Sequence, residues 1–289
     1  MFFDKFKQVP DNNFTSFFYA VNVMNKLTQL KFVLSIFLIF LVVVSCKEKQ
    51  SGSQKSNETS GISIAAAANL RDVLEEFKEA YIQENYGRKV EISFASSGLL
   101  VQQIINGAPF DLFLSADSSF PEKLKSNNKT FGNSSVYTYG RIALWSSNLD
   151  VSEGLKLVLN PKVKKIAVAN PQFAPYGKNA VEALKKSGLY AAIEHKIVWA
   201  ENINQAAQFA SSGNADIAFV ALSNVVGKEM KGKGKFYELS EQESSPIPQS
   251  GIILKGKTTT EAQLFFDFIK SEKSIKIWKK YGYKPVIEF

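Results

Sequence analysis

Four short segments of this chain could together bind an anion, because each places small polar residues or glycine at the start of a predicted helix. They are Ala68-Asn69-Leu70, Ser96-Ser97-Gly98, Pro175-Tyr176-Gly177 and Glu201-Asn202-Ile203. The start of a helix offers backbone N–H groups without partners and a partial positive charge. None of the four segments contains Lys or Arg. We therefore expect a fully ionised anion held by uncharged donors.

Three of these segments have residues typical of a helix cap. Asn69 and Asn202 are each followed three residues later by Asp or Gln, as in a capping box, and Ser97 is predicted to cap its own helix. The N–H of Ile203 is expected to be exposed in the first helical turn. A cap alone stabilises its helix by about 1 kcal/mol. For any single segment, a purely structural role therefore stays open.

The elements that must position these residues alternate between strands and helices. Strands are predicted near residues 62–66, 90–94, 110–114, 141–145, 165–169, 196–199, 216–220 and 251–254. Helices are predicted near residues 70–77, 99–104, 178–186, 203–211, 261–271 and 274–281. Strand, helix, strand at this spacing indicates parallel βαβ units with helices on both faces of a sheet.

The size and order of these elements predict two α/β lobes. Lobe 1 is expected to comprise residues 61–139 and 236–289, and lobe 2 residues 140–235. The last segment is assigned to lobe 1 because two helices and one strand are too little to fold alone. A chain that crosses twice between lobes leaves a cleft, and open α/β sheets bind ligands beyond the carboxyl ends of their strands.

Residues 1–45 have the pattern of a signal segment. Lys26 and Lys31 precede the apolar run 32–44, which is too short for a comfortable membrane span. The sequence upstream of Met24 lies outside this pattern. One interpretation is that translation begins at Met24.

The only cysteine of the chain follows this signal directly. Val43-Val44-Ser45-Cys46 resembles a lipobox, in which the signal is cut before the cysteine and a lipid is attached to its sulfur. Residues 46–60 are polar and rich in serine, so we expect a flexible tether between the lipid and the folded part. A buried, isolated thiol is the alternative for Cys46. One cysteine excludes a disulfide within the chain.

The composition is that of a globular protein with a sizeable core. The 289 residues are 45% hydrophobic and carry a formal net charge of +8. The positive charge is scattered, and its densest run, residues 228–235, is interleaved with glycine and predicted to be a solvated loop. Because no stacking platform or recognition motif accompanies the charge, we expect no binding to nucleic acid.

An enzyme and a surface adhesion or scaffold protein are the alternatives from other classes. His195 is the only histidine and is predicted to lie on the surface, and Ser97 lacks the Gly-x-Ser-x-Gly frame, so hydrolase chemistry has little support. Asp111 and Asp117 are expected to have structural roles. Core packing, rather than a binding surface, is predicted for the three tryptophans, Trp145, Trp199 and Trp278.

Several motifs occur in an order that is more specific than any one of them. They are Ala65-Ala-Ala-Ala-Asn-Leu70, Phe94-Ala-Ser-Ser-Gly98, Gly107-Ala-Pro-Phe-Asp-Leu-Phe-Leu-Ser-Ala-Asp117, Asn170-Pro-Gln-Phe-Ala-Pro-Tyr-Gly177, Ala200-Glu-Asn-Ile203 and Tyr281-Gly-Tyr283. Together they resemble the periplasmic molybdate-binding proteins of ABC importers, over nearly all of residues 61–289. The resemblance implies a type II periplasmic-binding-protein fold. In that fold each of two lobes is a mostly parallel sheet flanked by helices, and the ligand lies in the inter-lobe cleft.

The resemblance also implies a ligand and the residues that bind it. Molybdate, and tungstate of nearly the same size, would contact Asn69, Ser97, Tyr176 and the backbone N–H of Ile203, with Ala68 a further N–H candidate. No cofactor is implied. The implied protein is a monomer outside the cytoplasmic membrane, anchored as a lipoprotein, that delivers its ligand to an ABC-type permease.

The chain departs from one branch of this family around the pocket. Many members have Ser at the position of Asn69, Ala at the position of Tyr176 and Tyr where this chain has Ala221. The tyrosine hydroxyl would then come from the opposite side of the pocket. The combination of Asn and Tyr resembles a second branch, so the expected function stays the same.

The donor types suit a tetrahedral dianion that carries no proton at neutral pH. Such an ion needs only hydrogen-bond donors from the protein. Phosphate keeps a proton, so a phosphate site also contains an acceptor for that proton. Sulfate can be rejected only by size, since an undersized ion leaves donors unpaired at a cost of about 1–3 kcal/mol each. Another oxyanion such as sulfate, and less directly a secreted hydrolase, remain the alternatives.

Overall fold

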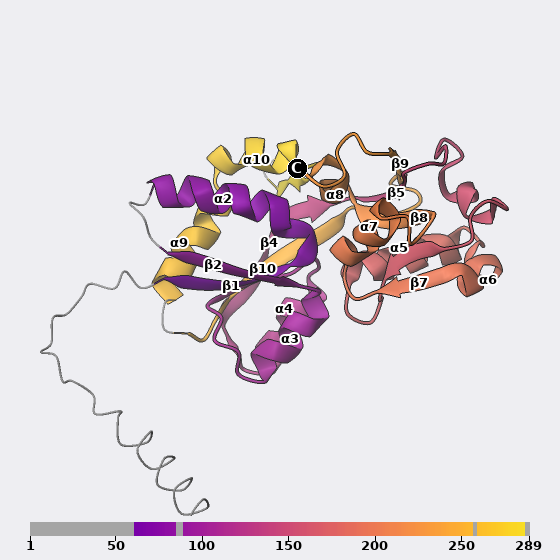
Figure 1. Cartoon of the computed structure of the whole chain (residues 1–289). Coiled ribbons are helices and arrows are strands. Elements are labelled where there is room, and N and C mark those ends of the chain that lie inside the picture. The colour runs from indigo at the N-terminus through magenta and orange to yellow at the C-terminus, as the bar shows by residue number, and fades with distance from the viewer. Residues whose placement is uncertain (1–60, 85–88, 257–258, 287–289) are drawn as a thin grey trace, which may run out of the picture. The chain divides into compact units, whose positions relative to one another are not determined.

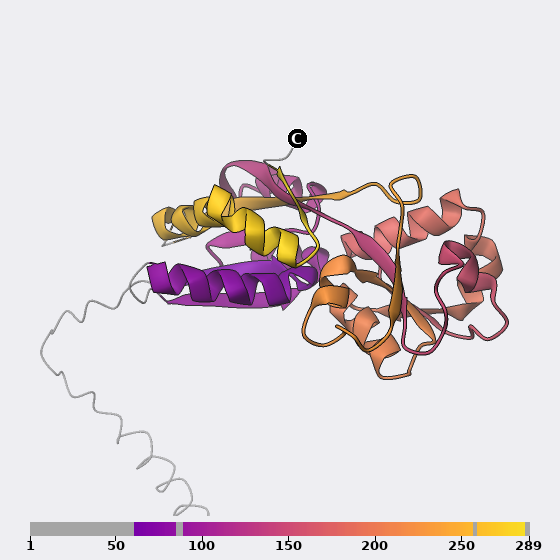
Figure 2. The ribbon, with the colours of Figure 1, turned by 90° about the horizontal axis from the view of Figure 1, so that it is seen from above.

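The computed structural model describes residues 61–84, 89–256 and 259–286, which lie in one compact unit and form two α/β lobes (Figures 1 and 2). The predicted signal segment, Cys46 and the tether lie outside the described residues. Within the described ranges, no helix is both long enough and apolar enough to cross a membrane.

A six-stranded mixed sheet forms the centre of lobe 1. Its strand order is β11-β4-β10-β3-β1-β2. β1 pairs in parallel with β2 and β3, whereas β10 pairs antiparallel with β3 and β4, as does β11 with β4. The bounds are β1 Ile62–Ala67, β2 Val90–Ala95, β3 Leu112–Leu114, β4 Thr130–Gly140, β10 Ile247–Leu254 and β11 Lys284–Pro285.

Helices cover both faces of this sheet. Successive residues of a strand face opposite sides, so Ile64 packs in the cluster that holds Leu74 of α2, whereas Ala65 packs with Leu100 of α3. Figure 1 shows α2, α9 and α10 on one side and α3 and α4 on the other. The bounds are η1 Ala68–Leu70, α2 Arg71–Glu84, α3 Ser97–Ile105, α4 Ser119–Ser126, α9 Thr259–Ile269, η4 Glu272–Ser274 and α10 Ile275–Lys280.

A five-stranded mixed sheet forms the centre of lobe 2. Its order is β7-β6-β8-β5-β9, with parallel pairs around β6 and antiparallel pairs around β5. The strands are β5 Ile142–Ser146, β6 Ile166–Ala169, β7 Ile197–Ala200, β8 Ile217–Ala221 and β9 Lys235–Glu238. The helices are η2 Gly154–Leu159, α5 Pro175–Lys186, α6 Tyr190–Ile193, η3 Glu194–Lys196, α7 Ile203–Ser211 and α8 Leu222–Val226.

The two faces of the lobe 2 sheet bury different side chains. Val168 and Phe219 pack in the cluster that holds Leu184 of α5. Ala167 and Ala218 instead pack with the alanine-rich face of α7. Alternation along β6 and β8 therefore sandwiches the sheet between α5 and α7, whose N-termini lie at the carboxyl ends of β6 and β7.

Most strands of each sheet point the same way, which confirms the predicted fold class. In lobe 1, β2, β1, β3 and β4 share one direction and β10 and β11 oppose it. In lobe 2, β7, β6, β8 and β9 share one direction and β5 opposes it. The opposed strands β5 and β10 are those that enter a lobe from the other lobe.

The chain crosses back to lobe 1 later than predicted. Residue 236 lies inside β9, and β9 pairs with β5 in the lobe 2 sheet. The return therefore falls between Glu238 and Ile247. The sequence pattern missed β4, β9, β11, α4, α6 and α8, because these elements are short or, in β4, largely polar.

The predicted environments of the tryptophans are correct at two positions of three. Trp145 and Trp278 are each 1% exposed, as expected for core residues. Trp199 is 44% exposed on the edge strand β7, so the prediction of a core role was wrong there. His195 is exposed in η3, and the 228–235 run is largely exposed, as predicted.

Candidate functional site

Asn69 lies in the turn η1, between β1 and α2, and is 3% exposed. Its Nδ2 donates to Gln249 Oε1 at 3.0 Å and to the Tyr283 hydroxyl at 2.9 Å. The residue before η1 is Ala67, and no side chain caps this turn. The predicted cap at Asn69 is therefore wrong, and its amide belongs to a buried polar network instead.

Ser97 is the first residue of α3 and is 1% exposed. Its hydroxyl accepts a hydrogen bond from the N–H of Ala116 at 3.0 Å. Ser96 occupies the cap position without forming a side-chain cap bond, and its hydroxyl is one of a few buried side-chain groups in the described ranges without a hydrogen-bond partner. The predicted cap at Ser97 is therefore wrong. Accepting from Ala116 still leaves its own proton to donate.

Tyr176 lies in the first turn of α5, which begins at Pro175, a residue well suited to the first helical position. Its hydroxyl accepts a hydrogen bond from Gln249 Nε2 at 2.9 Å. Burial, and secondly the nearby Tyr283, raise the pKa of Tyr176 well above its usual value. The hydroxyl therefore stays protonated at neutral pH. A Cβ at Gly177 would overlap the Ala169 carbonyl, so this turn of α5 needs glycine.

Asn202 caps α7, as predicted. Its Oδ1 accepts from the N–H groups of Asn204 at 3.0 Å and Gln205 at 3.1 Å. The Gln205 side chain accepts from the N–H of Glu201 at 2.7 Å, one residue earlier than in a capping box. These bonds leave the N–H of Ile203, the first residue of α7, outside the cap.

Hydrogen bonds between the lobes bring the four segments together. The first segment meets the fourth where Asn204 Nδ2 donates to the Ala68 carbonyl at 2.8 Å. The second meets the third where the N–H of Gly98 donates to the carbonyl of Phe173, just before α5, at 2.9 Å. Four strand-to-helix junctions thus converge at the lobe boundary, and the lobes are closed in this structure.

An oriented chain of amides supports the contact at Ala68. The N–H of Ala221 donates to Asn224 Oδ1 at 3.1 Å, and Asn224 Nδ2 donates to Asn204 Oδ1 at 2.7 Å. Because the chain starts at a backbone donor and ends at a backbone acceptor, each amide has only one possible orientation. Ala221 thus contributes its backbone N–H to this chain of amides.

A second donor from lobe 2 binds the same turn. Ser223 Oγ, in α8, donates to the Asn69 carbonyl at 2.9 Å, and the Tyr283 hydroxyl lies 3.1 Å from Ser223 Oγ. Two carbonyls of the first segment, those of Ala68 and Asn69, therefore accept hydrogen bonds from lobe 2. The backbone of η1 therefore contacts lobe 2 directly when the lobes are closed.

A cavity of about 380 Å³ opens at the lobe boundary beside these contacts. Lobe 1 contributes Ala68, Asn69, Arg71 and Asp72, and lobe 2 contributes mainly amide side chains. Ser97, Tyr176 and Ile203 are not among its lining residues. The structure thus brings the four segments together, but of the predicted contact side chains only Asn69 reaches this cavity.

Charged groups near the first segment are occupied elsewhere. The Arg71 guanidinium lies over the ring of Phe94, 4.5 Å from its centroid. Asp72 Oδ2 accepts from the N–H of Lys228 at 3.1 Å, a further contact between the lobes. Sequence reasoning missed Arg71, although it follows the first segment directly.

Sequence reasoning also missed Gln249 and Tyr283, which contact Asn69. Gln249 is a polar residue in the otherwise largely apolar strand β10, and this was the one local signal available. Asp111 and Asp117 have structural roles, as predicted. Asp111 Oδ2 accepts from the N–H of Ser63 at 2.9 Å, and Asp117 Oδ1 accepts from N–H groups at the start of α4.

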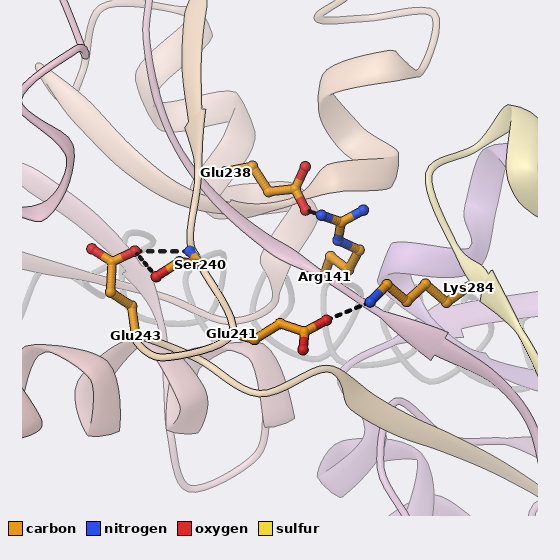
Figure 3. Close-up of polar contacts among 6 residues, drawn as sticks. All are labelled: Arg141, Glu238, Ser240, Glu241, Glu243 and Lys284. Atoms are coloured by element: carbon orange, nitrogen blue, oxygen red, sulfur yellow. Dashed lines mark hydrogen bonds and ion pairs between the residues drawn. The ribbon is translucent and has the colours of Figure 1, made fainter. Parts of the chain in front are cut away.

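Ion pairs lie where the chain crosses between the lobes (Figure 3). Arg141, between β4 and β5, pairs with Glu238 at the end of β9, and Lys284 of β11 pairs with Glu241. The bond from Lys284 lowers the pKa of Glu241. Solvent screens such pairs, so they contribute little to stability. They help to position the crossings without forming part of a binding pocket.

The family model for bacterial extracellular solute-binding proteins matches residues 62–284. The chain belongs to this family.

Two relatives support a closer comparison with this solute-binding protein. The molybdate-binding protein ModA of Rhodobacter capsulatus is 37% identical over 221 residues, which cover 76% of this chain and 86% of the relative. ModA of Azotobacter vinelandii is 38% identical over 227 residues, covering 77% and 89%. The solved periplasmic molybdate-binding protein of Azotobacter vinelandii superposes with a TM-score of 0.72 at 32% identity, covering 77% of this chain and 98% of that one.

Gly98→Ala is expected to oppose closure of this solute-binding protein. A Cβ at residue 98 would lie 2.8 Å from Phe173 Cα in the other lobe, whereas the nearest atom of its own lobe is the ring tip of Phe120 at 3.1 Å. The variant should therefore bind its solute about tenfold more weakly in calorimetry, with little change in the melting temperature of the unliganded protein.

Gln102→Ala, on the exposed side of α3, is the matched control and should bind as the unmodified protein does. Unchanged affinity in Gly98→Ala would show that closure does not require this approach of the two backbones.

Proposed function

We propose that this protein binds molybdate outside the cytoplasmic membrane and delivers it to an ABC-type permease. The observation that carries the proposal is the convergence of four strand-to-helix junctions at a closed lobe boundary. It occurs in a chain that is 37–38% identical to two molybdate-binding proteins.

The proposed ligand shell consists of uncharged donors. Ser97 and Tyr176 each accept one hydrogen bond from the protein and have a proton left to donate. Ile203 offers its backbone N–H, the first of α7, and Asn69 offers its own backbone N–H in the turn η1. The Asn69 amide can also reach the anion by exchanging one of its two present partners. These groups stabilise an unprotonated dianion without a buried counter-charge.

Selectivity then follows from donor geometry. Tungstate nearly matches molybdate in size and should bind in the same shell. Sulfate is smaller and would leave donors unpaired, at about 1–3 kcal/mol each. Sulfate transport is thus the nearest alternative function, and a secreted hydrolase is a more distant one.

The remaining parts of the proposal concern location. The lipobox-like run before Cys46 supports a lipid anchor, with residues 46–60 as the tether to a monomeric binding unit. A secure anchor needs more than one acyl chain. Held in this way, the closed protein would diffuse in two dimensions beside its permease.

The function is tested by the melting temperature of the purified protein with a panel of oxyanions. A ligand at a thousand times its Kd stabilises the protein by about 4 kcal/mol, or about 8–16 °C for a unit of this size. Molybdate and tungstate should give this shift, and phosphate should give none. A sulfate shift equal to that of molybdate would favour the sulfate alternative, and the absence of any shift with molybdate would refute the proposal.

Ser97→Ala should weaken molybdate binding about 10- to 100-fold, because one hydrogen bond to a charged ligand is lost. Calorimetry measures the affinity, and thermal unfolding without ligand reports any cost of unpairing the Ala116 N–H.

Ser126→Ala is the matched control, since it removes an exposed hydroxyl at the end of α4 that donates to the Lys123 carbonyl of the same helix. Equal affinities in both variants would remove Ser97 from the proposed shell.

Cys46→Ser should release the protein from membranes, because serine cannot accept a thioether-linked lipid. Fractionation of cells that express the full chain should show the unmodified protein in the membrane pellet and the variant largely outside it. Ser45→Ala keeps a small residue before the cysteine and should stay in the pellet. If the unmodified protein is soluble, Cys46 is not an anchor.

A further inference from the structure

Gln249 is a fully buried amide on the strand that returns from lobe 2 to lobe 1. It is 0% exposed, and its backbone pairs with Thr138 of β4, the strand that leaves lobe 1. A buried amide is costly unless its donor and acceptor groups are both satisfied. Its partners therefore reveal what this position requires.

The two ends of the Gln249 amide contact one proposed ligand residue from each lobe. Oε1 accepts from Asn69 Nδ2 of lobe 1 at 3.0 Å, and Nε2 donates to the Tyr176 hydroxyl of lobe 2 at 2.9 Å. The Tyr137 hydroxyl lies 3.4 Å from Oε1, but its shorter bond goes to the Ser115 carbonyl at 2.8 Å. The amide of Gln249 thus connects Asn69 to Tyr176.

The direction of these bonds is fixed by a backbone carbonyl. The Tyr283 hydroxyl donates to the Asn69 carbonyl at 2.8 Å, so its oxygen must accept from Asn69 Nδ2. The same nitrogen faces Gln249 Oε1. Oε1 cannot face both neighbours, so Nε2 faces Tyr176.

This direction decides what the Tyr176 hydroxyl can do. A hydroxyl has one proton and two acceptor positions. Since Gln249 donates to this oxygen, the Tyr176 proton is not used in that bond and points elsewhere. A carboxylate in the place of the amide would have the opposite effect, because it would take the proton.

We propose that Gln249 is a positioning residue, which aims the Tyr176 proton at the oxyanion and holds Asn69 in register with it across the lobe boundary. This inference rests on the proposed function. Gln249 has no predicted contact with the anion and acts through Tyr176 and Asn69. Gln249 thereby extends the site, because it determines whether the Tyr176 hydroxyl is free to donate to the ligand.

Gln249→Glu is the sharpest test, because it changes polarity while keeping size. At pH 8 the introduced carboxylate accepts from Asn69 and Tyr176 alike and places a negative charge near the anion. Molybdate binding should weaken at least about 100-fold relative to the unmodified protein. As the pH falls towards 5.5, the buried carboxyl gains a proton and can donate again, so this ratio should shrink by about tenfold. Because the charge alone also repels the anion, the change with pH reports only that residue 249 lies close to the site, and the Tyr176→Phe background separates this repulsion from the aiming of the proton.

Gln249→Met removes both hydrogen bonds and keeps a similar volume. We expect about tenfold weaker molybdate binding, and the melting temperature without ligand measures any loss of fold. Gln263→Met makes the same chemical change on the exposed side of α9 and should leave the affinity unchanged.

A double-mutant cycle shows whether the effect passes through the tyrosine hydroxyl. In the Tyr176→Phe background there is no proton to aim, so Gln249→Met should weaken binding by no more than about threefold. An equal loss from Gln249→Met in both backgrounds would overturn the inference.

Failure of this inference can be distinguished from failure of the proposed function. If the unmodified protein binds molybdate and the Gln249 variants bind equally well, only the role of Gln249 is refuted. If the unmodified protein binds no molybdate, the proposed function falls and this inference falls with it.

Discussion

The structure depends on hydrogen bonds between uncharged groups, which satisfy the buried polar groups at the lobe boundary. Asn69, Gln249 and Ser223 are each no more than 5% exposed, and each has hydrogen-bond partners from a distant part of the chain. An unsatisfied buried polar group costs about 1–3 kcal/mol. These bonds therefore hold the two lobes in one relative arrangement and allow few alternatives. Because an unpaired buried donor carries this cost, donors at the boundary favour an ion whose oxygens accept hydrogen bonds.

Closure and ligand recognition share the same short turn. In η1, the carbonyls of Ala68 and Asn69 accept hydrogen bonds from lobe 2 side chains. A ligand that accepts from the N–H groups of η1 and a lobe 2 side chain that donates to its carbonyls would polarise the same peptide groups. Such bonds strengthen one another in a low-dielectric setting. This favours a mechanism in which the anion and the second lobe stabilise each other's contacts.

The architecture explains why distant segments meet here. Parallel strands β1 and β2 in lobe 1, and β6 and β7 in lobe 2, each lead into a helix at the edge of their sheet that faces the other lobe. Glycine is required where backbones approach closely, as at Gly98 against Phe173 and at Gly177 against Ala169. The crossings between the lobes lie between β4 and β5 and between β9 and β10. The boundary is therefore built from strand ends rather than from a separate linker.

The sequence determined the elements whose signals are local. Short apolar runs placed most strands. The Asn202 cap and the helix start at Ile203 were predicted correctly because a cap forms within four residues. The caps assigned to Asn69 and Ser97 were wrong, since η1 is a 3-10 turn and Ser96 holds the cap position. Only the tertiary structure decided the polar network, because Gln249 finds its partners 180 and 73 residues away in the chain. Hydrogen bonds over such separations leave no periodic pattern in the sequence, so they exist only once both lobes have folded and met.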